Sequence, residues 1–240
     1  EIEQDKDFKF LYKVLKEKKP LQRTDMFRNL QIVIQDKASV AVVVALNPEP
    51  DDIIIDFASA PGIKDILIQK LTENKAKIIG ADVNISRLKR EGLLLKKAKI
   101  KNVDLVNQDS QFDSIRFGNK GLFDAPCDSS GMIVEEPTVL MRLEKDKNII
   151  SRYSKLQKNI LLKILNKKNS LDYLIYSVCS LFPEEGESHF ENDYIYKLTE
   201  RPLSIAHDGY QGFKVSPYSA RFYPHLDGTY GFFITKIRFK

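Results

Sequence analysis

From residue 53 onward the sequence alternates short apolar runs with polar or helical segments, and this alternation limits the folds open to the chain. The five runs are IIIDFA, KIIGAD, VDLVNQ, GLFDAP and LDYLIYSVCS. Strands buried on both faces are typically continuous apolar runs, and helices between them allow parallel pairing. NISRLKREGLLLKKAK and SRYSKLQKNILLKILNKK carry the leucine and isoleucine stripe of amphipathic crossover helices. The pattern predicts an α/β fold with a mostly parallel sheet.

The flanking segments add three expectations. Near the start, DFKFLYKVLKEKK places apolar residues from Phe8 to Leu15 at helical spacing, which predicts an amphipathic docking helix. The valine-rich segment QIVIQDKASVAVVVALN is ambiguous, because its valines favour a strand while its length suits a helix. At the other end, RFYPHLDGTYGFFITKIRFK has two β-rich arms around Asp227 and Gly228, which predicts an antiparallel hairpin.

Length and composition bound the organisation and the partners. The 240 residues suffice for one well-buried domain, so we expect an N-terminal appendage over residues 1–34 and a main domain over residues 35–240. No stretch approaches the ~20 apolar residues of a membrane-spanning helix. We expect a soluble monomer without membrane contact, in the cytoplasm, or in the nucleus or nucleolus of a eukaryote. The net charge of +5 permits RNA as a partner without requiring it.

Polar side chains close all five predicted strands. Asp56, Asp82, Asp109, Asp124 and Cys179 each lie at or just beyond the carboxyl end of an apolar run. Open α/β sheets bind their ligands at that edge. We therefore expect these five side chains to line one crevice.

The segment DFASAPGIKD, between the first strand and its helix, predicts a ligand loop. Pro61 and Gly62 form a tight turn, and the following backbone amides lie at a helix N-terminus. The loop lacks the three-glycine dinucleotide fingerprint and the phosphate-loop motif, which disfavours pyrophosphate and triphosphate ligands. Asp82 follows at about the spacing from which an acidic residue binds ribose hydroxyls, and Asp109 could hold an adenine amine. An ordinary turn and two helix N-caps remain alternative interpretations.

The two cysteines are placed in polar turns directly after apolar runs. Cys127 lies in LFDAPCDSSG and Cys179 in LIYSVCSLFPEEGE, which favours reactive thiols over core residues. A helix that begins near Glu184 would help to lower the pKa of the Cys179 thiol. A buried filler and a disulfide remain alternatives. The histidines and cysteines match no metal-ligand spacing, so we expect no metal.

In this order the segments resemble the signatures of RNA 5-methylcytosine methyltransferases of the Nop/Sun type. IQDKASVAVVVAL is similar to the family's Gln-Asp-x-Ala-Ser segment, IIIDFASAPGIK to its Ala-Ala-Pro-Gly-Gly-Lys loop, and DVNISR to its Asp-x-x-x-x-Arg. DAPCDSSG resembles Asp-Ala-Pro-Cys-Ser-Gly-x-Gly, YSVCSLFPEEGE resembles Tyr-Ser-Thr-Cys-Ser-x-x-Pro-Glu-Glu-Asn-Glu, and the tail resembles closing Arg-x-x-Pro and Gly-Phe-Phe elements. The resemblance implies a Rossmann-like S-adenosylmethionine-dependent methyltransferase fold in which the valine-rich segment is helical.

The resemblance also implies a role for each matching residue. The loop residues Ala58, Ser59, Ala60, Pro61, Gly62, Ile63 and Lys64 would hold the methionine part of S-adenosylmethionine. Asp82 would bind its ribose and Asp109 its adenine, with Arg87 supporting the pocket. Asp124 would lie between cofactor and base, Cys179 would be the nucleophile and Cys127 would assist release.

The chemistry explains why such groups are needed. Carbon 5 of cytosine is a poor nucleophile, so a thiolate must first add to carbon 6 and push electron density onto carbon 5. Cys179 suits that step, and an acid such as Asp124 at ring nitrogen 3 would relieve the negative charge that develops. A base must then take the proton from carbon 5. The expected substrate is a transfer or ribosomal RNA.

Two departures from the family pattern motivate a rival hypothesis. Ile63 replaces a glycine, and a β-branched residue excludes the positive φ and the close cofactor approach that glycine allows. Asp128 and Ser129 replace a Ser-Gly pair after Cys127. The rival is an RNA-binding or assembly protein that keeps the fold without turnover. A methyltransferase for DNA or a small molecule is a third possibility.

RNA contacts are expected from two basic regions. The first is the lysine-rich N-terminal segment. The second includes Lys214, Tyr218, Arg221 and Tyr223, where cations alternate with aromatic side chains able to stack on bases. An ordinary solvated face is the alternative interpretation.

Overall fold

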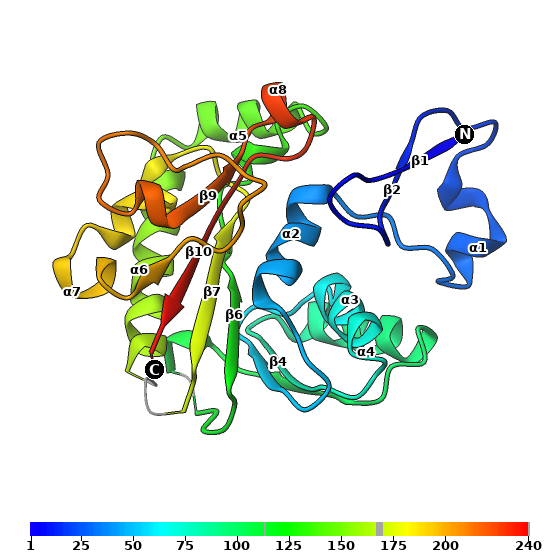
Figure 1. Ribbon diagram of the computed structural model, residues 1–240, viewed down its shortest axis with the longest axis horizontal. Helices are drawn as coiled ribbons and strands as arrows, with labels where there is room; N and C mark the ends of the chain where they lie inside the picture. The colour runs from blue at the N-terminus through cyan, green and yellow to red at the C-terminus, as the bar shows by residue number, and fades with distance from the viewer. Residues whose placement is uncertain (113, 167–169, 240) are drawn as a thin grey trace.

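A mixed β-sheet forms the centre of the computed structural model, which describes residues 1–112, 114–166 and 170–239 (Figure 1). The strand order is β5-β4-β3-β6-β7-β10-β8, and β9 pairs with β10 outside this path. The strands are β3 (Ile53–Asp56), β4 (Lys77–Asp82), β5 (Val103–Asn107), β6 (Lys120–Asp124), β7 (Tyr173–Val178), β8 (Thr199–Glu200), β9 (Ser219–Phe222) and β10 (Phe232–Arg238). β3 to β7 pair in parallel, whereas β10 is antiparallel to β7, β8 and β9. The predicted mostly parallel sheet and C-terminal antiparallel pair are confirmed.

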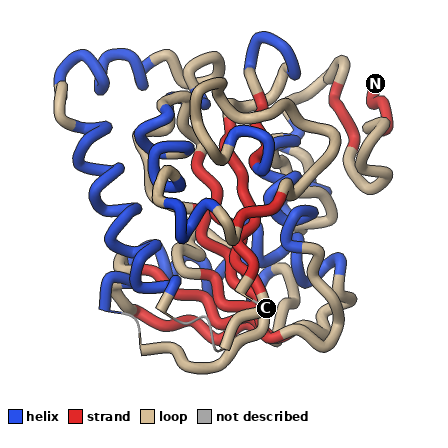
Figure 2. Tube along the Cα trace, turned by 60° about the vertical axis from the view of Figure 1, so that its left-hand side comes forward, coloured by secondary structure: helices blue, strands red, loops and turns tan. Residues whose placement is uncertain are grey.

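Helices and loops enclose this sheet (Figure 2). The α-helices are α1 (Asp25–Arg28), α2 (Lys37–Leu46), α3 (Ile63–Leu71), α4 (Ile85–Lys97), α5 (Thr138–Lys145), α6 (Ile149–Leu165), α7 (Asp193–Tyr196) and α8 (Pro224–Asp227). Short 3-10 helices are η1 (Leu21–Arg23), η2 (Ser110–Phe112), η3 (Ser130–Met132), η4 (Pro183–Glu185), η5 (Glu187–Phe190) and η6 (Ser216–Tyr218). One apolar cluster joins α2 and α3 to the sheet, and a second joins α6 to the opposite face. The two crossover helices expected from their leucine stripes are therefore present as α4 and α6.

The valine-rich segment forms α2, as the family resemblance implied. The Asp36 carboxylate accepts a hydrogen bond from the Ala38 amide at 2.8 Å, and the helix ends at Asn47 with φ 44°. Val40, Val42 and Val43 are at most 2% exposed. Valine is tolerated in this helix because the free energy gained by burying it against β3, β6 and β10 exceeds the loss due to its weak helix propensity.

The N-terminal docking helix is a wrong prediction. Strands β1 (Ile2–Gln4) and β2 (Tyr12–Val14) pair antiparallel instead. Between them, one oxygen of Asp5 accepts hydrogen bonds from two backbone amides, those of Asp7 and Phe8. Such a local bond offers the backbone an alternative to a helix. Only Phe8 of the apolar stripe is buried, and it packs in the cluster that contains α2.

The C-terminal hairpin turn contains a short helix. Helix α8 connects β9 to β10 and ends at Gly228, whose φ is +62°. The register pairs Phe232 with Phe222 and Thr235 with Ser219. In the part of the chain that the structure describes, none of the helices has the length and apolar character to cross a membrane.

The expectation that Arg221 contacts RNA is wrong, because its side chain is 0% exposed. Its guanidinium donates from Nε and Nη2 to the two oxygens of Glu187, each at 2.6 Å, and from Nη1 to the Ser180 carbonyl at 3.0 Å. It also lies 4.2 Å from the Tyr210 ring centroid. From the sequence, a buried arginine cannot be told from an exposed one, since its acidic partner lies 34 residues away.

We expect Glu187→Ala to lower the free energy of unfolding by about 3–5 kcal/mol, because it leaves the Arg221 guanidinium buried without its counter-charge. Replacing both residues, with Arg221→Met and Glu187→Leu, should recover much of that loss. Urea unfolding monitored by circular dichroism measures both changes. Glu200→Ala is the matched control, because it removes the partner of an exposed arginine, Arg238, and should change the midpoint little. Equal shifts for Glu187→Ala and Glu200→Ala would contradict this account.

Candidate active site

The carboxyl ends of the parallel strands gather the side chains expected there. Asp56, Asp82 and Asp124 are the last residues of β3, β4 and β6. Cys179 directly follows β7, and Asp109 follows β5 by two residues. Because these strands are parallel neighbours, the five residues meet at one edge of the sheet. The predicted placement is therefore correct for all five.

The loop from Ala58 to Lys64 connects β3 to the start of α3. Gly62 is the N-cap of α3 with φ +88°, a conformation that glycine adopts without strain. A Cβ atom at Gly62 would lie 2.7 Å from Cγ of Glu91, so the loop also approaches α4 closely. Ile63 is the first residue of α3 and is not among the residues with positive φ. The backbone strain expected at Ile63 is thus absent, because the left-handed residue is Gly62.

Arg87 links this loop to the end of β4. Its Nη2 donates to the Ala60 carbonyl, and its Nη1 lies 3.3 Å from an oxygen of Asp82. The Asp82 carboxylate also accepts from the Asn84 amide at 2.7 Å, while Asn84 itself caps α4. Asp82 is therefore not the N-cap of that helix. Asp109 accepts from the Gln111 amide at 2.9 Å, at the start of η2.

A layer of buried carboxyl groups lies beneath the loop. Asp56, Asp65 and Glu91 are each at most 1% exposed. Burial raises the pKa of Asp56 to about 7, with the charge of Glu91 adding to the shift. Burial also raises the pKa of Asp65 and of Glu91, and Asp65 contacts both other carboxyls. Shared protons make such contacts favourable, so the layer holds protons near neutral pH.

Sequence reasoning missed Asp65 and Glu91, although one signal was available. Leu88, Glu91 and Leu95 are the buried residues of α4 and lie at helical spacing. A glutamate inside an apolar stripe needs a polar partner within the core. Here the partner is Ser59 of the loop, whose hydroxyl donates to Glu91 at 2.9 Å.

The two cysteines lie side by side. Their sulfur atoms are 3.0 Å apart, and both residues are partly buried. The hydrogen bond with Cys179 raises the pKa of the Cys127 thiol well above its usual value, and burial and the charge of Glu185 add to the shift. The pair is therefore better described as two interacting thiols than as buried fillers.

Asp124 is held by two donors beside the thiols. The Ser177 hydroxyl donates to Oδ1 at 2.6 Å and the Lys64 ammonium to Oδ2 at 2.5 Å. Burial opposes the charged form of Lys64, but the charges of Asp124 and Asp56 outweigh it and raise the pKa of the ammonium. The charge of Cys179 contributes in the same direction. Lys64 is thus the positively charged side chain that interacts with both Asp124 and the charge of Cys179.

The helix expected near Glu184 is absent. Two 3-10 helices, η4 and η5, occupy that segment, so no long helix directs its N-terminus at Cys179. Instead the Gly131 amide donates to the Cys179 carbonyl at 3.0 Å, and the Gly231 amide donates to the Gly131 carbonyl at 2.9 Å. A Cβ atom at Gly131 would overlap the Gly231 carbonyl oxygen, so only glycine permits this approach. Cys179 is therefore positioned by the Gly131 amide in the loop after β6, and Gly131 is held in turn by Gly231, which directly precedes β10.

Glu185 and Asp128 complete the surroundings of Cys127. One ligand atom from each of the three residues lies within 4.8 Å of the others, a spacing that a metal ion could also use. Glu185 is 0% exposed, and burial with the charge of Asp128 raises its pKa to about 7. Its Oε2 accepts from the Asp128 amide at 3.2 Å. Among the described residues, Oε1 of Glu185 has no hydrogen-bond partner.

The fold is that of the S-adenosylmethionine-dependent methyltransferases. The chain is similar to the solved structure of NSun6 from Pyrococcus horikoshii with SFG, an S-adenosylmethionine analogue, with a TM-score of 0.77 and 31% identity. The match covers 92% of this chain and 56% of that one. Residues 43–238 match the family described as 16S rRNA methyltransferase RsmB/F, and the chain belongs to that family. The resemblance inferred from the sequence motifs is confirmed.

Two relatives with assigned names are also similar. A tRNA (cytosine(72)-C(5))-methyltransferase of Pyrococcus horikoshii is 36% identical over 211 residues, which cover 85% of this chain and 51% of that protein. A 28S rRNA (cytosine-C(5))-methyltransferase of Mus musculus is 31% identical over 236 residues, which cover 91% of this chain and 29% of that protein. The chain therefore spans about half or less of the length of these relatives.

The residues at the loop fit the methionine end of S-adenosylmethionine. Gly62 presents backbone without a side chain at the start of α3, and the amides there can bind a carboxylate. The Asp82 carboxylate at the next strand end suits ribose hydroxyls. S-adenosylmethionine is the cofactor of this family.

We expect Gly62→Ala to weaken binding of S-adenosylmethionine about tenfold, because the new methyl group strains the left-handed turn by ~1–2 kcal/mol and meets Glu91. Isothermal titration calorimetry measures the affinity. Gly228→Ala is the matched control, since Gly228 also has positive φ but has nothing within 4 Å of the added Cβ atom. An equal affinity of Gly62→Ala and wild type would contradict the role of the turn. If the wild-type protein binds no S-adenosylmethionine, the rival hypothesis of a protein without turnover gains support.

Proposed function

We propose that the protein transfers a methyl group from S-adenosylmethionine to carbon 5 of a cytosine in transfer or ribosomal RNA, through a covalent bond to Cys179. The observation that carries the proposal is the pair of thiols 3.0 Å apart, beside an Asp124 carboxylate that both Ser177 and Lys64 contact. The names of the relatives, which are RNA cytosine methyltransferases, support the same reaction. We propose that the protein acts as a monomer in the cytoplasm, or in the nucleus or nucleolus of a eukaryote.

Binding of the cofactor is assigned to the loop and the next strand ends. The residues Ala58, Ser59, Ala60, Pro61, Gly62, Ile63 and Lys64 would hold its methionine part. Asp82 would bind its ribose, Asp109 its adenine, and Arg87 would fix the loop against Asp82. When bound, S-adenosylmethionine supplies an electrophilic methyl group on a sulfonium ion.

The reaction begins at Cys179. Its thiolate adds to carbon 6 of the cytosine, and the electrons of the ring double bond move toward carbon 5 and nitrogen 3. The two sulfur atoms lie 3.0 Å apart, and we assign the proton between them to Cys127, because the hydrogen bond with Cys179 and burial raise the pKa of the Cys127 thiol. Cys179 is thereby the sulfur that is free to attack.

Nitrogen 3 of the ring gains negative charge in this step and needs a proton. At rest both oxygens of Asp124 accept hydrogen bonds, so Asp124 alone holds no proton to give. The Lys64 ammonium lies 2.5 Å from Oδ2. We assign the proton to this pair: Lys64 passes it to Asp124, and Asp124 delivers it to nitrogen 3.

Release requires a base at carbon 5. After carbon 5 has taken the methyl group, its proton must leave and the bond between carbon 6 and Cys179 breaks, so that the ring double bond re-forms and Cys179 leaves as a thiolate. Nitrogen 3 then returns its proton through Asp124 to Lys64. Cys127 is assigned to accept the proton from carbon 5. It must first lose its own. Once Cys179 is bonded to carbon 6, that sulfur no longer holds the proton on Cys127 as the thiolate did, and Glu185, whose pKa burial raises to about 7, offers an oxygen within 4.8 Å as the acceptor.

RNA contacts are assigned to two regions of the surface. Lys214 pairs with Asp193 at 2.5 Å and is about half exposed, and Tyr218 is 39% exposed next to Tyr196. Both can reach a ligand, unlike Arg221. We also propose that residues 1–34 form an appendage to a methyltransferase domain of residues 35–240, and that the lysines of this appendage contact RNA.

Replacing each of the two cysteines should block a different step of the reaction. We expect Cys179→Ala to abolish both methylation and covalent attachment to RNA, because no thiolate can add to carbon 6. Cys127→Ala should instead accumulate a covalent protein–RNA adduct, since carbon 5 keeps its proton. Denaturing gels of each variant, incubated with RNA transcripts and S-adenosylmethionine, separate these outcomes. Loss of activity in Cys127→Ala without any adduct would refute the release role, and an adduct in Cys179→Ala would refute the choice of nucleophile.

Lys64→Arg tests the proton assigned to the pair with Asp124. Arginine keeps the positive charge but does not release a proton, so we expect kcat to fall by about 10²- to 10⁴-fold. Lys120→Arg is the matched control, because Lys120 is also buried and paired, with Asp52 at 2.7 Å, but lies at the opposite end of β6. Single-turnover methylation of RNA measures both variants. A wild-type rate in Lys64→Arg would show that nitrogen 3 obtains its proton elsewhere.

A further inference from the structure

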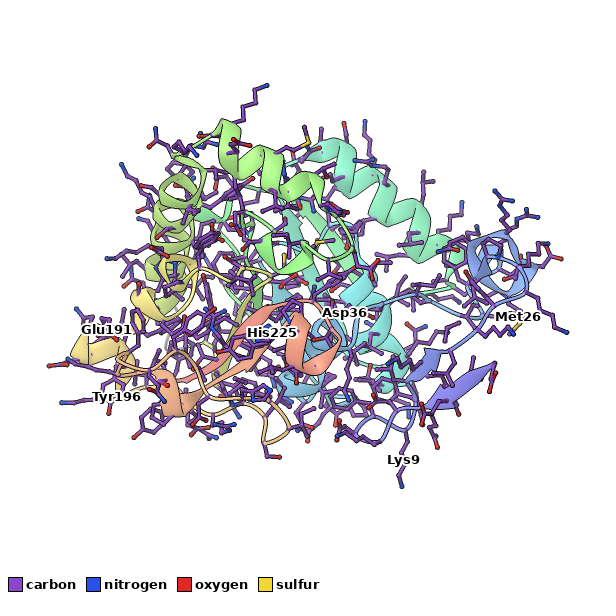
Figure 3. All side chains as sticks on the ribbon, turned by 90° about the horizontal axis from the view of Figure 1, so that it is seen from above. Lys9, Met26, Asp36, Glu191, Tyr196 and His225 are labelled. Carbon is purple, nitrogen blue, oxygen red and sulfur yellow. The ribbon has the colours of Figure 1, made fainter. Side chains whose placement is uncertain are left out.

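A hollow lined by aromatic and leucine side chains lies at the same end of the molecule as the thiols. Its volume is about 360 Å³, and its lining residues are Leu181, Tyr210, Tyr223, His225 and Leu226. Figure 3 looks onto this end and shows His225 on α8. The hollow is open to solvent on the α8 side, since Leu226 is 61% exposed and His225 is also exposed.

The hollow shares a wall with the segment that carries Cys179. Leu181 is two residues from Cys179, and two residues span at most ~7 Å. The Tyr210 hydroxyl donates to the Leu181 carbonyl at 2.8 Å. Any molecule that fills the hollow therefore lies next to whatever occupies the thiol site.

The rings of the hollow are held in place from behind. The Tyr223 ring lies 5.9 Å from that of Tyr210 and 5.8 Å from that of His225, measured between centroids. The buried guanidinium of Arg221 lies over the Tyr210 ring at 4.2 Å. Asp227 accepts from the Tyr223 amide at 2.7 Å and so fixes α8 against the ring. A flat ligand could stack here without first ordering these side chains.

We infer that this hollow binds the base of a nucleotide adjacent to the target cytosine, by stacking against Tyr223 or His225. The inference rests on the proposed function, because it requires RNA at the thiol site. A cytosine that reaches Cys179 must leave its stack, and its neighbour then loses a stacking partner. Aromatic side chains replace such a partner for any base, since every base has a π-face. The guanidinium behind the Tyr210 ring is paired with Glu187, so that arginine adds no net charge to the hollow.

Fluorescence anisotropy tests this inference with a short fluorescein-labelled single-stranded RNA that has a single central cytosine. We expect Tyr223→Ala to weaken RNA binding by about 5- to 150-fold, the equivalent of ~1–3 kcal/mol per stacked base. Tyr223→Phe keeps the ring and should retain the wild-type affinity. Phe117→Ala is the control, because Phe117 is an exposed aromatic residue in the segment before β6, at the opposite end of that strand from Asp124. If Tyr223→Ala does not fold, His225→Ala, at an exposed position, takes its place.

The second arm uses the same RNA with an abasic nucleotide on the 5′ or the 3′ side of the cytosine. One of these should weaken binding to the wild-type protein as much as Tyr223→Ala does, and combining the two changes should give no further loss. Additive losses, or an unchanged affinity of Tyr223→Ala, would overturn the inference. If the RNA is methylated normally but these affinities do not change, the role of the hollow is refuted and the proposed function is not. If the RNA is neither bound nor methylated, the proposed function itself is refuted.

Discussion

The parallel pairing of β6 with β7 is the constraint on which the rest of the site depends. It sets Asp124 opposite Ser177, and both strands then leave the sheet at the same edge. Cys127 follows β6 by three residues and Cys179 follows β7 by one, so the two thiols meet although 52 residues separate them. The hydrogen bond from the Ser177 hydroxyl to Asp124 follows directly from the same register. A slip of one residue would turn Ser177 to the other face and separate these groups.

Burial makes this arrangement electrostatically demanding. Lys64 carries a positive charge at a partly buried position, while the Asp65 carboxyl contacts those of both Asp56 and Glu91. Three ionised carboxylates could not coexist there, and their raised pKa values show that protons relieve the repulsion. Burial thus raises the pKa of all three acids beneath the loop and favours their neutral forms, while Lys64 pairs with Asp124.

The sequence predicted the features that follow from strand ends and missed those that follow from tertiary partners. Five apolar runs became five parallel strands, because burial on both faces demands such runs. The apolar stripe from Phe8 to Leu15 did not become a helix, because the Asp5 carboxylate fixes a turn where the stripe begins. Arg221 carried no sign that Glu187 would bury it. Glu91 did carry a sign, its position in an apolar stripe, but its partner Ser59 lies on another element.

The contacts of Gly231 have a consequence for how the chain matures. Gly231 holds Gly131, which in turn holds the carbonyl of Cys179, and β10 directly beyond it completes the sheet beside β7. Residues 231–238 leave the ribosome after every other part of the thiol site. Until they join the sheet, the segment that bears Cys179 lacks both its backbone clamp and its neighbouring strand. A nascent chain that is arrested before this point therefore carries both cysteines but lacks the contacts of Gly231 and β10 that hold the segment of Cys179 in place.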